Sequence, residues 1–181
     1  MSSKWIAGAR PRTLPAAISP VVVGTALAVR LSSSVDYFNA LLALIVSLAL
    51  QVAVNYANDY SDGIKGTDEK RVGPVRLVGS GLASAAAVKR AAFLSFGVAA
   101  LAGTLLATRT SYLLILVGIV SIGAAWTYTG SNKPYGYRGF GEISVFLFFG
   151  IIATVGTFYA AAEYLAWQAF VLSIPVGALS C

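Results

Sequence analysis

The amino-acid sequence predicts an all-α, polytopic membrane protein. Of its 181 residues, 57% are apolar and only 11% are charged, whereas a soluble domain is about 25% charged. The charged residues divide the chain into six uncharged stretches, each near the ~20 residues that an α-helix needs to span a bilayer. These stretches do not alternate between apolar and polar residues, which argues against the strands of a membrane β-barrel.

The six stretches are the expected transmembrane helices of a single domain over residues 1–181. They comprise residues 13–29, 37–58, 91–108, 110–132, 143–162 and 164–181. Pro15 and Pro20 interrupt the first stretch, so we interpret it as a retained, kinked helix and not as a secretory signal. Residues 59–90 form the one long predicted loop, and any chemistry is expected there.

Basic residues are distributed unequally between the two ends of this bundle. With six spans, eleven of the thirteen Lys and Arg residues fall on one side, and only Arg30 and Arg109 fall on the other. The N-terminus, the 59–90 loop and the 130–141 loop are therefore predicted to face the cytoplasm. The net charge of +6 does not indicate a nucleic-acid partner, because charges this sparse leave most of a soluble surface uncovered.

Residue types that are missing or rare exclude several kinds of active site. The chain has no histidine, which removes histidine triads, imidazole bases and histidine-ligated metals. Its one cysteine, Cys181, cannot form an internal disulfide or a thiolate cluster. Any metal site must therefore use oxygen ligands.

Oxygen ligands gather at the end of the second stretch. Asp59, Asp62 and Asp68 lie within ten positions of one another. If the helix continues this far, Asn55, Asp59 and Asp62 share one face, and Gln51 extends that face toward the membrane. Buried carboxylates need a positive partner, and oxygen ligands without His or Cys favour Mg²⁺. A solvated helix end with ordinary surface charges is the structural alternative.

Magnesium held by one or two carboxylates usually also binds phosphate oxygens of a substrate. The expected substrate is therefore a phosphate or diphosphate. The two basic loops supply cations for such an anion: Lys65, Lys70, Arg71, Arg76 and Lys133.

Four segments extend this interpretation: GARPRTLP at 8–15, VNYANDYSDGIKGTD at 54–68, GPVRLVGSG at 73–81 and YTGSNKPYGYRGFGE at 128–142. Together they resemble the UbiA superfamily of intramembrane prenyltransferases, most closely its actinobacterial members that act on 1,4-dihydroxy-2-naphthoate. The resemblance implies a UbiA-type bundle in a bacterial plasma membrane, with about six of about nine spans present. The family has a second acidic motif on a later helix that this sequence does not include, so we expect an N-terminal part of a longer protein.

The resemblance also implies a reaction and its residues. A polyprenyl group would pass from polyprenyl diphosphate to 1,4-dihydroxy-2-naphthoate with loss of CO₂, giving demethylmenaquinone, with Mg²⁺ as cofactor. The implied metal ligands are Asn55, Asp59, Asp62 and Asp68, of which the first three are also the implied catalytic residues. The implied substrate contacts are Arg12, Lys65, Arg71, Arg76, Lys133 and Tyr128.

Three questions stay open at this stage. Tyr56, Tyr60, Tyr128 and Tyr135 are candidates to shield a carbocation with their π-faces, or else anchors at the membrane interface. A sibling enzyme with 4-hydroxybenzoate or homogentisate as acceptor would use the same ionisation chemistry. A cation transporter would use the same acidic residues as an ion pathway, although its polar residues should then extend deep into several spans.

Overall fold

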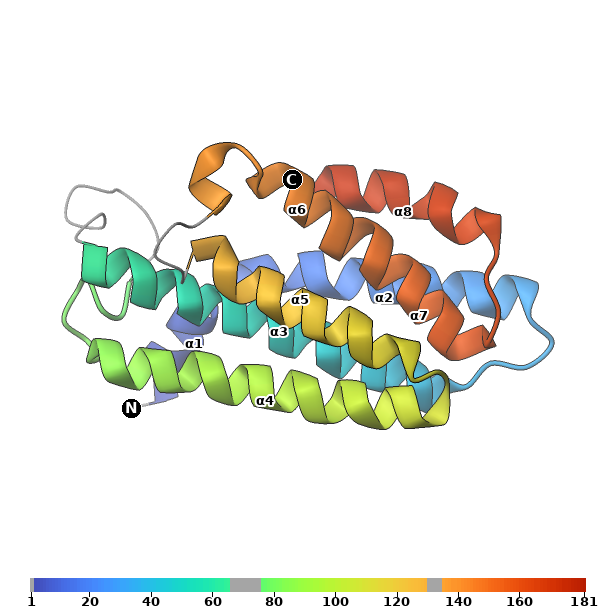
Figure 1. Ribbon diagram of the computed structural model, residues 1–181, viewed down its shortest axis with the longest axis horizontal. Helices are drawn as coiled ribbons and strands as arrows, with labels where there is room; N and C mark the ends of the chain where they lie inside the picture. The colour runs from blue at the N-terminus through green and yellow to red at the C-terminus, as the bar shows by residue number, and fades with distance from the viewer. Residues whose placement is uncertain (1, 66–75, 130–134) are drawn as a thin grey trace.

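The computed structural model describes residues 2–65, 76–129 and 135–181, and among them there are helices and no strand. Figure 1 shows the longer helices lying side by side along the long axis of the molecule. The elements in chain order are α1 (Ser2–Ala9), η1 (Pro11–Thr13), α2 (Leu14–Leu31), α3 (Tyr37–Lys65), α4 (Ala85–Arg109), α5 (Leu113–Thr129), η2 (Tyr135–Arg138), α6 (Gly141–Val145), η3 (Phe146–Ile152), α7 (Ala153–Ala162) and α8 (Trp167–Ser180).

The six predicted apolar stretches coincide with six helical segments, so the all-α, polytopic prediction is confirmed. Four segments are long and apolar enough to cross a membrane: Lys4–Leu31, Tyr37–Lys65, Ala85–Arg109 and Gly141–Ala162. Helices α5 and α8 are also apolar, but at 17 and 14 residues they are shorter than a typical span. The chain is therefore a multi-pass membrane protein with four full-length spans in its described residues.

The predicted loop at 59–90 is shorter than expected. Helix α3 continues to Lys65 and therefore includes Asp59 and Asp62, while α4 already begins at Ala85. The extension of α3 is possible because its end is covered by protein: Ser61 and both carboxylates are buried there. Ser84 caps the start of α4 by accepting a hydrogen bond from the backbone N–H of Ala87.

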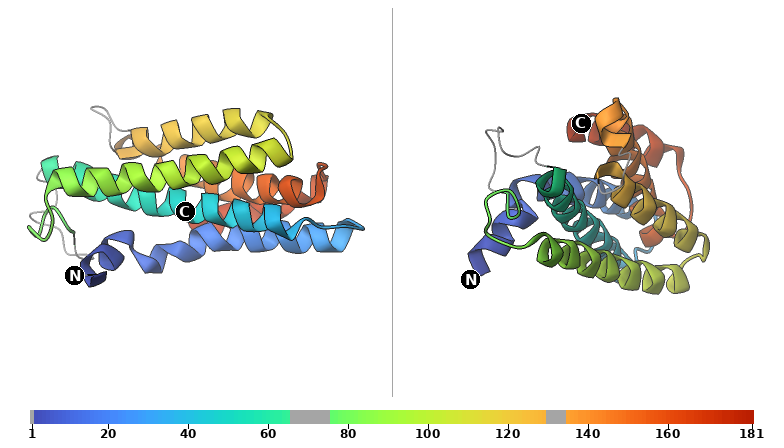
Figure 2. Two further views of the ribbon diagram at one scale, coloured as in Figure 1. Left: turned by 90° about the horizontal axis from the view of Figure 1, so that it is seen from below. Right: turned by 60° about the vertical axis from the view of Figure 1, so that its left-hand side comes forward.

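Helix α3 is the central helix of the bundle, packed against α2, α4 and α7. The two views in Figure 2 show it enclosed by these neighbours. Its most extensive contact is with α4, and the buried faces of both helices are rich in alanine. Small side chains let helix backbones approach closely, which is the usual basis of packing inside lipid.

The two ends of the bundle differ in composition. The connections 32–36, 110–112 and 163–166 meet at one end, on the right in Figure 1, while the N-terminus and the ends of α3 and α5 meet at the other. At the first end, Arg109 donates to Asn39 at 2.7 Å and forms an ion pair with Asp36 at 2.9 Å. These contacts join the end of α4 to the start of α3.

The span from Gly141 to Ala162 contains a π-helix, η3, between α6 and α7. On one side of η3, Gly150 lies directly against Gly177 of α8, where an added Cβ would stand 2.5 Å from the Gly177 Cα. This glycine pair lets α8 cross the span closely. Short π-helical segments within α-helices frequently occur at functional sites.

Candidate functional site

A cavity of about 500 Å³ lies inside the bundle, lined by α2, α3, α4, α5 and the span that contains η3. Most of its lining is apolar. The polar lining residues at the end of the bundle that holds the N-terminus and the acidic residues, here called the mouth, are Asn55, Asn58, Tyr128, Tyr135 and Ser144, while a few others, such as Ser47 and Thr104, lie deeper. A polar mouth over an apolar interior fits a ligand with a charged head and a hydrocarbon tail.

Asp59 is completely buried next to this mouth. Its Oδ2 accepts a hydrogen bond from the backbone N–H of Leu77 at 2.8 Å, and its Oδ1 accepts one from Val78 at 3.0 Å. The carboxylate therefore holds the segment that precedes α4, residues 76–83, here called the strap. Charge-assisted hydrogen bonds of this type compensate part of the cost of burying a carboxylate.

The strap covers the end of α3 through close packing. Leu77 is completely buried, and its side chain lies against Gly8, where an added Cβ would stand 2.6 Å from Leu77 Cδ1. Val78 lies equally close to Gly63 of α3, at 2.4 Å from an added Cβ. Larger residues at these two glycines would push the strap away from the buried carboxylate.

Asp62 lies one turn beyond Asp59 and is only 4% exposed. Its Oδ2 pairs with Nη1 of Arg76, the first residue of the strap, at 3.3 Å. The predicted helical face of acidic residues is therefore present, and each carboxylate faces positively polarised groups from the strap. Arg76, predicted as a diphosphate contact, reaches the acidic cluster itself.

Asn55 is used differently from the two acids. Its Nδ2 donates to the Ala9 carbonyl at 2.8 Å and to Thr13 Oγ1 at 2.9 Å. Gln51 also donates to Thr13 Oγ1, at 3.0 Å. These two amides fasten residues 9–13, here called the hook, onto α3. The amide nitrogen of Asn55 is thus committed to the hook, although the residue also lines the cavity.

The hook contains Arg10, which sequence reasoning placed only among the basic residues. Arg10 has a left-handed backbone, with φ 53° and ψ 70°, and its Nε and Nη2 atoms are buried. A non-glycine residue in this conformation is strained and is often found at functional sites. Arg12, the predicted substrate contact, is exposed instead. No sequence signal distinguishes the two arginines, because the left-handed turn depends on the contacts from α3.

Asn58 is a second residue that sequence reasoning missed. It lines the cavity, and its Oδ1 accepts a hydrogen bond from Thr129 Oγ1 at the end of α5. Asn58 lies four residues before Asp62, and Asn55 lies four residues before Asp59, so the two pairs have the same helical spacing. Lys65 also reaches α5, donating to the Thr129 carbonyl at 3.3 Å.

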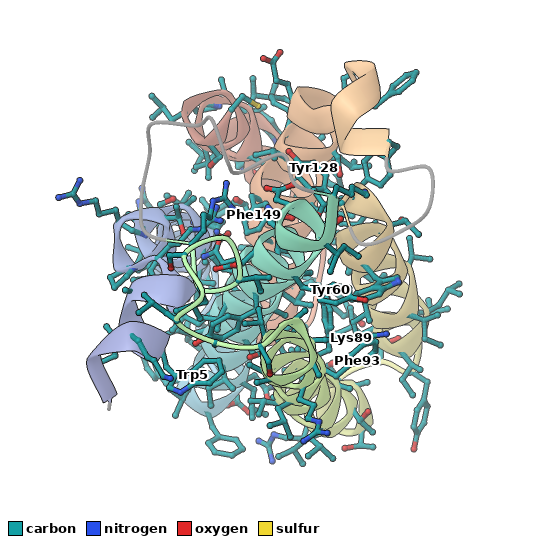
Figure 3. All side chains as sticks on the ribbon, turned by 90° about the vertical axis from the view of Figure 1, so that its left-hand side faces the viewer. Trp5, Tyr60, Lys89, Phe93, Tyr128 and Phe149 are labelled. Atoms are coloured by element: carbon teal, nitrogen blue, oxygen red, sulfur yellow. The ribbon has the colours of Figure 1, made fainter. Side chains whose placement is uncertain are left out.

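The four candidate tyrosines divide into two pairs. Tyr128 and Tyr135 line the cavity and contact each other edge to face, with ring centroids 5.6 Å apart. Tyr56 lies under the strap and donates to the Trp5 carbonyl, and Tyr60 stacks on Trp126 below the ammonium of Lys89. Figure 3 shows Tyr60 and Lys89 together, apart from Tyr128. Only Tyr128 and Tyr135 are placed to face a ligand in the cavity.

Three predicted site residues, Asp68, Arg71 and Lys133, lie outside the described residues. Within the described ranges, no group of three or more His, Cys, Asp or Glu side chains is arranged to hold a metal ion. The oxygen atoms at this end of α3 are nevertheless of the type that Mg²⁺ prefers: the amide oxygen of Asn58, which lines the cavity, and the carboxylates of Asp59 and Asp62, which lie beside it on the same helix. In this structure these oxygens accept hydrogen bonds or pair with a guanidinium.

Comparison with known proteins identifies the family. Residues 17–181 match the UbiA prenyltransferase family, and the chain belongs to it. The chain is 55% identical over 179 residues to the 1,4-dihydroxy-2-naphthoate octaprenyltransferase of Mycobacterium tuberculosis, covering 99% of this chain and 61% of that protein.

Two further relatives carry the same description. The Mycobacterium leprae protein is 54% identical over 178 residues, covering 98% of this chain and 60% of its own length. The Escherichia coli protein is 40% identical over 168 residues, covering 89% and 54%. The chain therefore spans about 60% of the length of the mycobacterial relatives it matches.

Proposed function

We propose that the complete protein transfers a polyprenyl group from polyprenyl diphosphate to 1,4-dihydroxy-2-naphthoate, with loss of CO₂ and release of diphosphate, and so forms demethylmenaquinone in its reduced form, demethylmenaquinol. The main observation behind the proposal is the pair of buried carboxylates, Asp59 and Asp62, on the same end of α3 as Asn55 and Asn58, which line the apolar cavity. We take the acceptor from the names of the mycobacterial relatives, which are 1,4-dihydroxy-2-naphthoate octaprenyltransferases.

We assign the metal to the end of α3. Asp59 and Asp62 would hold Mg²⁺ with an amide oxygen from Asn55 or Asn58, and Asp68 is a further proposed ligand. When bound, Mg²⁺ neutralises the diphosphate and makes it a better leaving group. The proposed diphosphate contacts are Arg12, Lys65, Arg71, Arg76 and Lys133, to which Arg10, with its buried Nε and Nη2 atoms, adds a sixth.

The apolar cavity protects the reaction from water. Cleavage of the allylic C–O bond leaves a carbocation, which the electron-rich ring of the acceptor attacks. Tyr128 and Tyr135 lie at the mouth, where their π-faces would stabilise this cation. The apolar lining below them leaves no nucleophilic side chain of Lys or Cys to trap it among the described residues that line the cavity.

We place the protein in the bacterial plasma membrane with the N-terminus, the strap and the mouth on the cytoplasmic side. The unequal distribution of Lys and Arg supports this orientation, with eleven residues toward one side and two toward the other. A soluble acceptor and the diphosphate head would then reach the mouth from the cytoplasm.

The test uses membranes that contain the complete protein, supplied with polyprenyl diphosphate and Mg²⁺. With 1,4-dihydroxy-2-naphthoate as acceptor, we expect a prenylated product and release of CO₂, and both should disappear when EDTA is added. Asp62→Asn should be inactive while inserting normally into the membrane. Faster transfer to 4-hydroxybenzoate or homogentisate would assign the protein to a sibling activity, and unchanged turnover of Asp62→Asn would refute the metal assignment.

A further inference from the structure

The span that contains η3 presents one continuous face to the cavity. Its lining residues come in adjacent pairs four positions apart, at 144/145, 148/149, 152/153 and 156/157. In a regular α-helix, a side chain four residues farther along points about 40° away around the helix axis. Over the three steps from 144/145 to 156/157, the side chains would therefore rotate by about 120°. The π-helix η3 occupies the middle of these steps, and its wider turn compensates for this rotation. The same face therefore follows the cavity along its whole depth.

Side-chain size decreases along the middle of this face. Ser144 and Val145 lie nearest the mouth, Phe148 and Phe149 follow, then Ile152, Ala153 and Gly156, and Thr157 ends the face. Phe149 is labelled with Tyr128 in Figure 3. The wall on α4 also carries small residues, Ala99, Ala100 and Gly103, before Leu106. Small side chains on two helices therefore line part of the cavity, together with larger residues such as Leu114 and Ile115 of α5.

Helix packing among the described residues does not explain Gly156. A Cβ added there would meet no described heavy atom within 4 Å. Two other glycines lie at close helix contacts of this span. A Cβ on Gly150 would stand 2.5 Å from the Gly177 Cα of α8, and a Cβ on Gly24 of α2 would stand 2.6 Å from the Thr154 carbonyl oxygen. Gly156 instead adds open volume to the cavity, on a face that η3 keeps turned toward it.

We propose that Gly156 determines how long a prenyl chain the cavity accepts, a role that rests on the proposed function. With the diphosphate at the mouth, the chain must run down the apolar interior. The cavity extends along α3 from Asn58 to Ala43, which corresponds to roughly 22 Å of helix. A short prenyl group ends before the depth of Gly156, whereas a long one passes it. A side chain at this position therefore blocks long donors and leaves short donors unaffected.

The experiment compares two donors with the complete protein in membranes, geranyl diphosphate and octaprenyl diphosphate. For Gly156→Leu we expect kcat/KM with the octaprenyl donor to fall at least about tenfold, while kcat/KM with the geranyl donor stays close to the unmodified value. Gly156→Ala should give an intermediate ratio. Gly97→Leu is the matched control, because Gly97 also has no described neighbour within 4 Å of an added Cβ but does not line the cavity.

Each outcome decides the question. An unchanged ratio of the two kcat/KM values in Gly156→Leu overturns the inference. An equal loss with both donors also overturns it, because the residue would then be needed for packing and not for the choice of donor. If the unmodified protein transfers neither donor to any acceptor, the proposed function itself fails, and the chain-length role fails with it.

Discussion

Replacing Asp59 by Asn tests whether this carboxylate holds the strap. The two oxygens of Asp59 accept backbone hydrogen bonds from Leu77 and Val78. Asparagine has only one acceptor oxygen. Its amide NH₂ group would replace the second carboxylate oxygen and face a backbone N–H group, with which it cannot form a hydrogen bond. A hydrogen bond to a charged group contributes about 1.5–3 kcal/mol. We therefore expect Asp59→Asn to weaken the docked strap by about 2 kcal/mol, or about 30-fold in its opening equilibrium.

Hydrogen–deuterium exchange measures this effect directly, because the amides of Leu77 and Val78 are the groups that the carboxylate protects. In detergent without divalent cations, peptides from residues 76–83 should exchange about 30-fold faster in Asp59→Asn. Asp36→Asn, at the opposite end of the bundle, is the matched control and should leave the strap unchanged. Unaltered exchange of the strap would refute the reasoning, as would an equal increase along all of α3, which would indicate global unfolding.

Three further predictions follow from other contacts. Asn55→Asp keeps an oxygen ligand but removes the donor that fastens the hook, so prenyl transfer should fall about tenfold; normal turnover would favour a role for Asn55 as a metal ligand. Hydrogen bonds from the Asn39 backbone and from Arg109 lower the pKa of Asp36 from its usual 3.8. This exposed pair contributes under about 1 kcal/mol to the free energy of unfolding. The contribution should be complete at neutral pH and be lost as the pH falls through the lowered pKa of Asp36, so the unfolding temperatures at pH 3 and pH 6 measure it. Gly150→Leu should destabilise the protein by about 1–3 kcal/mol or more, seen as a lower unfolding temperature in detergent, whereas Asp36→Asn should change it little.

The predicted acidic face illustrates what sequence spacing can and cannot provide. Helical periodicity correctly placed Asn55, Asp59 and Asp62 on one face of α3. It did not indicate that the strap would return to cover this face, because the contacts of Leu77 and Val78 with Asp59 join residues 18 and 19 positions apart. The backbone N–H groups that hold the carboxylate carry no side-chain signature.

The hook shows the same limit. Arg10 and Arg12 are identical residues two positions apart, yet two guanidinium nitrogens of Arg10 are buried whereas Arg12 is exposed. The difference arises from the left-handed turn at Arg10, which the amides of Asn55 and Gln51 support from α3. A local sequence pattern cannot show a contact made by residues about 40 positions away.

Sequence alone determined that the protein is a helical membrane protein with its acidic and basic residues concentrated at one end. These properties depend on composition, on the length of apolar runs and on helical spacing, all of which act locally along the chain. Only the tertiary structure decided which side chains line the cavity, which arginine has buried guanidinium nitrogens, and why Gly156 is open while Gly150 is closely packed. Those features depend on how α3, the strap and the span with η3 pack together, and packing is a property of residues distant in sequence.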